Sequence, residues 1–492
     1  MIGDPSLLAL LSLTCIDPYY RRVSAGTLPD IVLLEIFDFY FVEVYDVYDV
    51  DDWHTLVHVC RRWRNVVFSS PRRLHLQLLC KPGRPVTEML DIWPKLPIFV
   101  LYDDISYPVA KETDNVIAAL KLKGSVSRID LTVSSSPATW EAFAAVMQDP
   151  FPMLEDLSLQ HHNMTPVISD SFLDGSAPRL QNLFLGGILF PALPNLLLSA
   201  TDLVDLFLWD IPHSGHISLE AMVTYISVLI RLKSLSLRFR SPRSRPDSVG
   251  RFLHPLRRTL LPALTYLDFK GVPEYLEDLV ARIDVPLLEH TDIMFFNQLV
   301  FDISQFSNLV CRTEKFAVLD QADVVLGSDS INIQFPQKDG AVNFIRLDLG
   351  ISCWKLDWQL SALAQVCNSC LPTLPSLECL RIYDDQYPSP HWQDDMENTQ
   401  WMEILHPFAT VKDLYLSKKV APRIASALQG LSEERVTKVL PALQDIFIDD
   451  PQPPGLAEEC FHEFVAARRR QVPSIPVAIR VRRWVREEGE EE

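Results

Sequence analysis

The chain has few glycines, only 16 among 492 residues. Loops that cradle phosphate groups need several glycines close together, because glycine alone lets the backbone approach the ligand closely. The sequence has no such loop, no G-x-S-x-G turn to present a nucleophilic serine, and no paired cysteines of the kind a zinc-binding RING needs. We therefore expect no enzyme activity, no catalytic residue, no metal and no cofactor.

Cysteine and positive charge are also scarce. The nine cysteines are odd in number and have no repeated spacing, which argues against a disulfide framework and favours the cytoplasm, the nucleus or both. The 45 Lys and Arg residues face 64 Asp and Glu residues, for a net charge of −19, which argues against a nucleic-acid partner. No stretch approaches the roughly twenty uninterrupted apolar residues of a membrane span, so we expect no membrane partner.

What the chain does have is a high apolar content, 48%, and two amphipathic patterns near its start. Thr27 and Pro29 form a helix-opening signal, and the apolar positions that follow cover more of the helix circumference than one core requires. From Trp53 to Val67 the helical spacing returns, with three arginines on the other side, until Ser69-Ser70-Pro71 ends it. We predict one helix from about Asp30 and a second, continuous helix from Trp53. Such a small helical unit needs a partner or the rest of the chain for stability.

This stretch resembles the F-box, the module that docks substrate receptors onto the Skp-family adaptor of cullin ubiquitin ligases. The matching pieces are Leu28-Pro29, the helix Ile31–Phe37, and Leu56-Val57-His58-Val59-Cys60-Arg61-Arg62-Trp63. The connection between Asp38 and Asp52 is longer and more acidic than is usual for the family. The resemblance implies that the adaptor is contacted by Leu28, Pro29, Ile31, Leu34, Ile36, Val59 and Trp63.

The rest of the chain is organised by repetition. A frame of the form apolar-x-x-apolar-x-apolar starts at Val126, Leu154, Leu180, Leu203, Leu232, Leu264, Phe344, Leu377, Val411 and Leu443. Each interval except the longest has room for one short strand and one helix, and many frames follow a proline that favours a turn. We predict an α/β fold in which an irregular leucine-rich-repeat solenoid follows the all-α module. Long parallel strands of a doubly wound sheet would instead be continuous apolar runs.

Two features make this predicted solenoid irregular. Between Leu264 and Phe344 the frame blurs, and residues 306–335 look like two strands around a turn. The asparagine that usually forms a hydrogen-bonded ladder along such repeats is also missing after Leu159 and Leu185. The order of the two parts resembles the F-box proteins of mushroom-forming fungi, on the segments LVHVCRRWRNVVFSSPRRL, LDIWPKLPI, PLLEHTDI and TEKFAVLDQADVVL.

Strand alternation predicts which side chains line the concave face of this solenoid. If the second and third apolar positions of each frame point inward, the residues between and beside them face outward. Large aromatic and charged side chains there suit the binding of a protein target. The predicted target-binding residues are Phe184, Phe207, Trp209, Arg238, Lys270, Arg381, Tyr383 and Tyr415.

The sequence thus predicts a substrate receptor of an SCF-type cullin ubiquitin ligase, which would bind a Skp-family adaptor and a protein target of unknown identity. The alternative is a repeat scaffold without a ligase, whose F-box-like helices only cap the solenoid. The predicted domains are an N-terminal extension (1–26), the F-box (27–74), a connecting segment and solenoid cap (75–125), the leucine-rich repeats (126–472) and a C-terminal tail (473–492).

Overall fold

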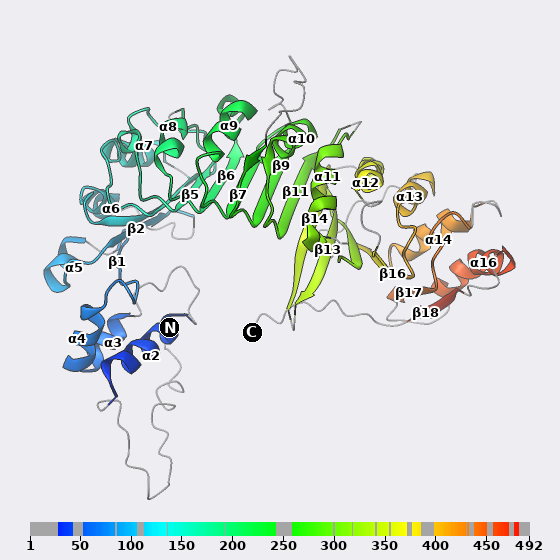
Figure 1. Cartoon of the computed structure of the whole chain (residues 1–492), viewed down its shortest axis with the longest axis horizontal. Helices are drawn as coiled ribbons and strands as arrows, with labels where there is room; N and C mark the ends of the chain where they lie inside the picture. Colours follow the sequence, from blue (N-terminus) through cyan, green and yellow to red (C-terminus); the bar gives the residue numbers. More distant parts are fainter. Residues whose placement is uncertain are drawn as a thin grey trace, which may run out of the picture. The chain divides into compact units, whose positions relative to one another are not determined.

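A computed structural model gives the fold of the chain (Figure 1). It describes residues 28–42, 53–83, 86–105, 113–134, 136–191, 193–242, 258–298, 301–316, 318–339, 342–353, 356–370, 376–384, 398–429, 431, 437–449, 456–471 and 477–481. The chain divides into two compact units, Met1–Leu131 and Thr132–Glu492. The extension 1–26, most of the acidic connection before Asp52 and the end of the tail lie outside the described residues. The predicted domain boundaries remain a prediction.

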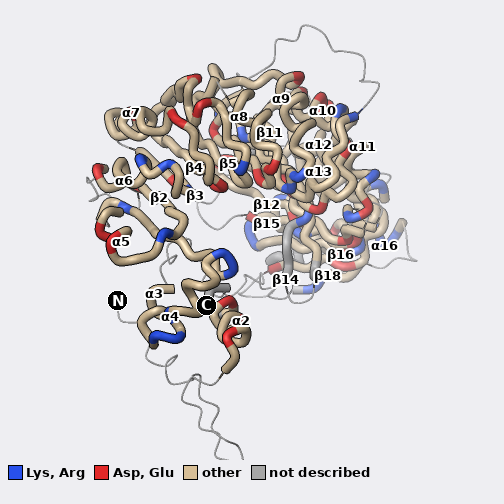
Figure 2. Tube along the Cα trace, turned by 60° about the vertical axis from the view of Figure 1, so that its left-hand side comes forward, with Lys and Arg blue, Asp and Glu red and all other residues tan. Residues whose placement is uncertain are grey.

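The described part of the first unit begins with three short helices, α2 (Asp30–Val42), α3 (Trp53–Val59) and α4 (Arg61–Ser69). The start of α2 directly after Leu28-Pro29 is as predicted. The prediction of one continuous second helix was wrong, because the backbone at Cys60 is extended and separates α3 from α4. The Cys60 Sγ accepts a hydrogen bond from the Trp63 amide at 3.5 Å, so this residue caps α4. Figure 2 shows the basic residues of α4 and the acidic residues of α2.

Three strands follow these helices, the first three in the order of the main sheet. Strand β1 (Leu78–Cys80) pairs in parallel with β2 (Ile98–Asp103), and β3 (Val126–Val133) is the next strand in order. The helices α5 (Val86–Ile92) and α6 (Thr113–Leu120) connect them. The side chains of β1 and the first five of β2 are buried, as a continuous apolar run predicts.

The second unit is built on one long sheet, and each frame from Leu154 onward supplies one strand. The strands are, in spatial order, β4 (Asp156–His161), β5 (Asn182–Gly186), β6 (Asp205–Ile211), β7 (Ser234–Phe239), β9 (Tyr266–Gly271), β11 (His290–Phe296), β14 (Val342–Ser352), β13 (Ser330–Asp339), β12 (Gln321–Leu326), β15 (Cys379–Asp384), β16 (Asp413–Ser417), β17 (Asp445–Asp449) and β18 (Ala478–Val481). A separate two-stranded piece joins β8 (Thr259–Leu260) to β10 (Ile283–Asp284). All pairs in the main sheet are parallel except β12–β13 and β13–β14.

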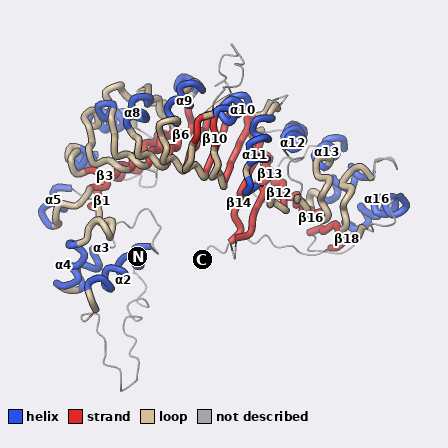
Figure 3. The backbone as a smooth tube through the Cα atoms, in the orientation of Figure 1, coloured by secondary structure: helices blue, strands red, loops and turns tan. Residues whose placement is uncertain are grey.

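The helices of this unit lie along one face of the sheet (Figure 3). They are α7 (Pro137–Val146), α8 (Leu193–Ser199), α9 (Leu219–Ile226), α10 (Pro273–Arg282), α11 (Ser304–Arg312), α12 (Leu356–Cys370), α13 (Asn398–Leu405), α14 (Ala421–Gln429) and α16 (Leu456–Gln471), with 3-10 turns η2 (Phe172–Gly175), η3 (His213–Gly215) and η4 (Glu314–Phe316). Leu157 and Leu159 of β4 are buried on this side while Ser158 between them is not. We call the side opposite the helices the open face. The strand–turn–helix units are those of a leucine-rich-repeat solenoid, not of a doubly wound sheet, which has helices on both faces. Within the described residues, no helix has the length and apolar character needed to cross a membrane.

Backbone hydrogen bonds take the place of the missing asparagine ladder. In each regular repeat one carbonyl oxygen accepts two successive amides from the next repeat, as the Glu155 oxygen does from Gln181 at 2.7 Å and Asn182 at 3.0 Å. The carbonyls that do this belong to Glu155, Gln181, Val204, Lys233, Thr265, Asp320, Glu378 and Lys412. A backbone carbonyl has two lone pairs, so both bonds can form without any particular side chain.

The region where the frame blurs contains an antiparallel insertion. Strands β12 and β13 form the predicted two strands around a turn, with Val324 in register with Ile333. Strand β13 then turns back into β14, which pairs in parallel with β11. The chain order β12, β13, β14 is therefore reversed in space. As a result β11 and β12, which are consecutive repeat strands, do not touch.

One glycine is required by the close approach of two repeats. Gly187 has φ +69°, and a Cβ atom there would lie 2.3 Å from the His161 carbonyl oxygen. Gly175 has nearly the same φ, +67°, but a Cβ there would meet only the Asn195 Cβ at 4.0 Å. Both positions have a left-handed backbone that is unfavourable for alanine. Only at Gly187 would the added Cβ also clash with a backbone atom.

We predict that Gly187→Ala destabilises the second unit by about 3 kcal/mol or more, while Gly175→Ala costs about 1 kcal/mol, the usual penalty for a left-handed alanine. Thermal and urea unfolding of the two full-length variants, followed by circular dichroism, would measure the difference. Equal losses would show that the His161 carbonyl can move away, and would contradict the prediction.

Candidate functional site

The helix α2 has apolar side chains on two sides. Leu33 and Phe37 are buried, and the Phe37 ring lies 4.8 Å from the ring of Trp63 on α4. On the other side Val32, Ile36 and Phe39 follow one another at i, i+4 and i+7, with Ile31 beside them. Ile31 is 61% exposed and Phe39 is 67% exposed. We call these four residues the α2 strip.

The chain entry to α2 is fixed by Arg62 of α4. Its guanidinium donates to the Leu28 carbonyl and forms an ion pair with Asp30 at 2.6 Å. The ion pair is exposed, and such pairs contribute only about 0–1 kcal/mol to stability. The main effect of the two Arg62 contacts is therefore to fix the position of the chain before α2. The contact holds the Leu28-Pro29 turn against α4.

The predicted adaptor residues fall into two groups. Pro29, Ile31, Ile36 and Val59 are exposed, as a docking surface requires. The other three, Leu28, Leu34 and Trp63, are partly buried, and Trp63 packs on Phe37. The prediction omitted Val32 and Phe39, although their helical spacing from Ile36 is visible in the sequence.

On the open face of the second unit, an aromatic cluster forms on β5 and β6. Phe184 and Phe207 are in register, and the Trp209 ring lies 4.9 Å from the Phe184 ring. The register between β6 and β7 shifts between Leu208 and Ile211, and Asp210 there has φ +50°. Trp209, which is 36% exposed, lies within this bulge. The cluster is large, aromatic and accessible, as a binding surface needs.

Trp209 is held in place from β7. Its Nε1 donates to the Ser236 Oγ at 2.7 Å, and the Arg238 guanidinium carbon lies 4.7 Å from the centre of the ring. Ser236 in turn donates to a carboxylate oxygen of Asp268 on β9. The indole therefore has one preferred orientation on the open face.

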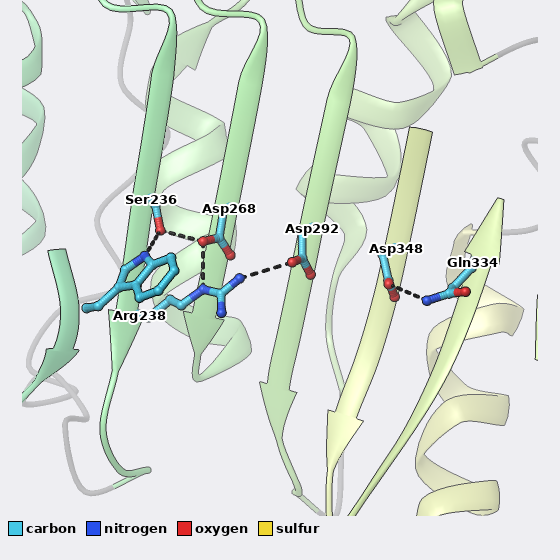
Figure 4. Close-up of polar contacts among 7 residues, drawn as sticks. Ser236, Arg238, Asp268, Asp292, Gln334 and Asp348 are labelled. Carbon is cyan, nitrogen blue, oxygen red and sulfur yellow. Dashed lines mark hydrogen bonds and ion pairs between the residues drawn. The ribbon is translucent and has the colours of Figure 1, made fainter. Parts of the chain in front are cut away.

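Arg238 bridges two carboxylates on neighbouring strands (Figure 4). Its Nε donates to the Asp268 Oδ2 at 2.6 Å and its Nη2 to the Asp292 Oδ2 at 3.1 Å. Asp268 is almost fully buried, whereas the Asp292 side chain is 37% exposed. Burial, and then the charge of Asp268, raises the pKa of the Asp292 carboxyl, while Arg238 opposes this shift.

Asp348 on β14 stands next to Asp292, with which it is in register. The Gln334 amide donates to its Oδ2 at 2.9 Å, as Figure 4 shows, but its Oδ1 is buried and has no hydrogen-bond partner within the described residues. Burial, followed by the charge of Asp292, raises the pKa of Asp348 to about 7, although the Gln334 and Asn332 amides oppose the shift. The carboxyl is thus half-protonated near neutral pH.

A second aromatic group lies near the other end of the open face. The rings of Tyr415 and Phe447 stack at 4.4 Å, and they are flanked by the guanidinium groups of Arg381 at 5.4 Å and Arg480 at 5.8 Å. Each of these residues is in register with the next. The four side chains stabilise one another through stacking and cation–π contacts.

The predicted target-binding residues therefore form two groups, with two outliers. Phe184, Phe207, Trp209 and Arg238 are brought together, and Lys270 is in register with Arg238. Arg381 and Tyr415 belong to the second group, with Tyr383 two residues along β15. The prediction missed Ser236, Asp292 and Asp348, although Asp348 occupies the same frame position as Phe184.

The histidines and cysteines are potential ligands of a metal ion. Among the described residues, no group of three or more His, Cys, Asp or Glu side chains could hold a metal ion. His161 accepts a hydrogen bond from the Met164 amide at 3.1 Å, and Cys367 is buried within α12.

No model of a known protein family matches the chain, and no curated protein matches it. Two solved structures are similar in part. An internalin from Listeria monocytogenes strain 4b F2365 shares 11% identity, over 71% of this chain and 81% of that one, with a TM-score of 0.25. The leucine-rich repeat-containing protein LegL7 from Legionella pneumophila shares 12%, over 79% and 96%, with a TM-score of 0.27. The repeat fold follows from the chain's own strands and turns.

We predict that Asp348→Asn stabilises the protein above pH 7. The folded carboxyl keeps its proton up to about pH 7, whereas the unfolded one loses it near 3.8, so the wild type loses stability as pH rises from about 4 to 7. Asparagine cannot ionise, so the variant should gain roughly 2–4 kcal/mol over the wild type across this window. Unfolding midpoints at pH 4, 6 and 8 would measure it. A constant difference at all three pH values would contradict the assigned pKa.

Proposed function

We propose that the chain is the substrate-receptor subunit of an SCF-type cullin ubiquitin ligase. The α2 strip binds a Skp-family adaptor, and the open face of the repeats binds a protein target. In this role the chain performs no reaction itself. It holds the target beside a ubiquitin-charged enzyme, which raises the effective concentration of the target. We expect such a protein in the cytoplasm or nucleus.

The α2 strip is the observation on which this proposal rests. A helix in a small unit normally buries its apolar residues on one side, and a contiguous exposed apolar patch marks an interaction site. On α2 two sides are apolar, and only the side with Leu33 and Phe37 is covered. Val59, at the end of α3, is exposed as well. The resemblance to the F-box proteins of mushroom-forming fungi supports the same proposal.

A repeat scaffold without a ligase is the second candidate, because the open face supports protein binding whether or not an adaptor is present. The aromatic cluster of Phe184, Phe207 and Trp209 is the feature that favours it. The two candidates differ only in whether the α2 strip binds the adaptor.

We predict that Ile31→Asp with Ile36→Asp abolishes binding to a Skp-family adaptor. Both side chains are exposed, so the fold should persist, while two charges placed in an apolar interface should weaken binding at least about 100-fold, since one buried anchor contributes about 2 kcal/mol or more. Co-expression followed by size-exclusion chromatography would test for the complex, and calorimetry would give the affinity.

Ile230→Asp is the matched control, because Ile230 lies in the second unit and is exposed to the same 61% as Ile31. It should leave the adaptor complex intact. A wild-type chain that is well folded but elutes without the adaptor would favour the scaffold. Equal loss of binding in the Ile230 variant would mean that the effect is not specific to the α2 strip.

A further inference from the structure

The centre of the open face has more negative than positive charge. Asp268, Asp292 and Asp348 stand side by side on β9, β11 and β14, at one register level of the sheet. Arg238 is bonded to the first two and reaches no further. Asp348 is followed at this level by the uncharged Gln334. The pair Asp292 and Asp348, which we call the carboxylate pair, is therefore short of a cation.

The Gln334 and Asn332 amides act on the Asp348 carboxyl, but they do not satisfy every acceptor atom at the pair. The Asp348 Oδ1 and the Asn332 Oδ1 are both buried acceptors without a partner within the described residues. Buried polar atoms are almost always paired, so two orphaned acceptors beside a carboxylate call for an added donor. Gly350, two residues beyond Asp348, has no side chain, and the flexible end of Met294 occupies that space. A thioether can move aside and then pack along the stem of an incoming side chain.

Three kinds of cation could neutralise the carboxylate pair: a proton, a metal ion or an organic cation. A proton does so only in part, since the pKa of Asp348 is about 7. A metal ion lacks ligands, because the third carboxylate, Asp268, is already bonded to Ser236 and Arg238. Among the described residues no group of three or more His, Cys, Asp or Glu side chains could hold a metal ion. An ammonium or guanidinium group meets both needs, since it brings a full charge and several donors.

We propose that Asp292 and Asp348 form the subsite for a lysine or arginine side chain of the protein target. The inference rests on the proposed target-binding role of the open face, which it makes more specific. Charge complementarity selects this occupant, and the bond from Arg238 to its Oδ2 holds Asp292 in place.

The aromatic cluster provides a second contact for the target, at a fixed distance from the carboxylate pair. Trp209 on β6 and Asp292 on β11 are separated by three strand spacings, or about 14 Å. An extended segment crossing the strands covers that distance in about four residues. The preferred target segment then has an apolar or aromatic residue about four positions from its lysine or arginine.

A fluorescein-labelled nonalysine peptide is the probe, and fluorescence anisotropy at 150 mM salt is the measurement. The Asp292→Asn/Asp348→Asn variant of the full chain should bind it at least tenfold more weakly than the wild type. The control is Asp205→Asn/Asp413→Asn, which removes the same charge from strands β6 and β16 of the same face. The control should lose less than twofold. Circular dichroism would confirm that both variants fold, and Asp292→Asn alone, at a half-exposed position, gives a second test.

The binding should also depend on pH. Asp292 on β11 and Tyr266 on β9 are the titratable groups that interact with Asp348, and the Asn332 and Gln334 amides face it from β13. Lysine stays charged from pH 6 to 8, whereas Asp348 loses its proton, so wild-type affinity for nonalysine should rise several-fold. In the Asp292→Asn/Asp348→Asn variant this rise should disappear.

Two results would overturn the proposal. The first is an equal loss in the two double variants, which would mean diffuse attraction to an acidic protein, and the second is no binding of nonalysine by the folded wild type. Either result would leave the adaptor complex of the α2 strip unaffected, so it would remove this inference without removing the proposed function.

Discussion

The second unit depends on one repeated backbone interaction, the carbonyl oxygen that accepts two amides from the next repeat. From Glu155 to Thr265 this pattern continues through five carbonyls, at distances of 2.7–3.2 Å. It fixes the start of each strand relative to the previous one, and with it the register of every side chain on the open face. Because no side chain is needed for it, the positions around each strand are free to vary. This explains how the repeats remain stacked without the usual asparagine.

The same backbone interaction explains where the carboxylate pair lies. The pattern stops after Glu289 and His290 and resumes at Asp320, because β13 and β14 are inserted between two repeats. The insertion places Asp348 beside Asp292, although 56 residues separate them in sequence. Glu289 has side-chain contacts at this break instead, with Lys315 at 3.4 Å and Arg346 at 3.9 Å. The uncompensated charge thus arises at the insertion, where β14 and not the next strand in the chain lies beside β11.

Much of this fold could be predicted from the sequence, since the ten frames mark ten of the strands and the position on each that faces outward. The double-sided α2 was also visible from its periodicity. The break at Cys60 was not, because the apolar spacing continues unchanged across it and a cysteine is an unusual cap. The meeting of Asp292 with Asp348 could not be predicted either. It depends on the reversed strand order, and a frame position indicates the face of a strand but not its neighbour.

The open face combines side chains that are well held by their neighbours with carboxylates that lack some of their partners. Trp209, Arg238, Tyr415 and Phe447 are each held by defined neighbours, so a partner that contacts them loses little side-chain entropy on binding. The carboxylate pair is different, because Arg238 pairs with Asp292 but not with Asp348, and the Asp348 Oδ1 has no hydrogen-bond partner within the described residues. A folded protein tolerates such a local cost where the surrounding structure fixes it, here through the hydrogen bonds of β11, β14 and β13. A ligand that relieves the cost gains free energy that a neutral ligand does not. The rigid aromatic residues therefore favour binding in general, and the unsatisfied carboxylates decide which partner is bound.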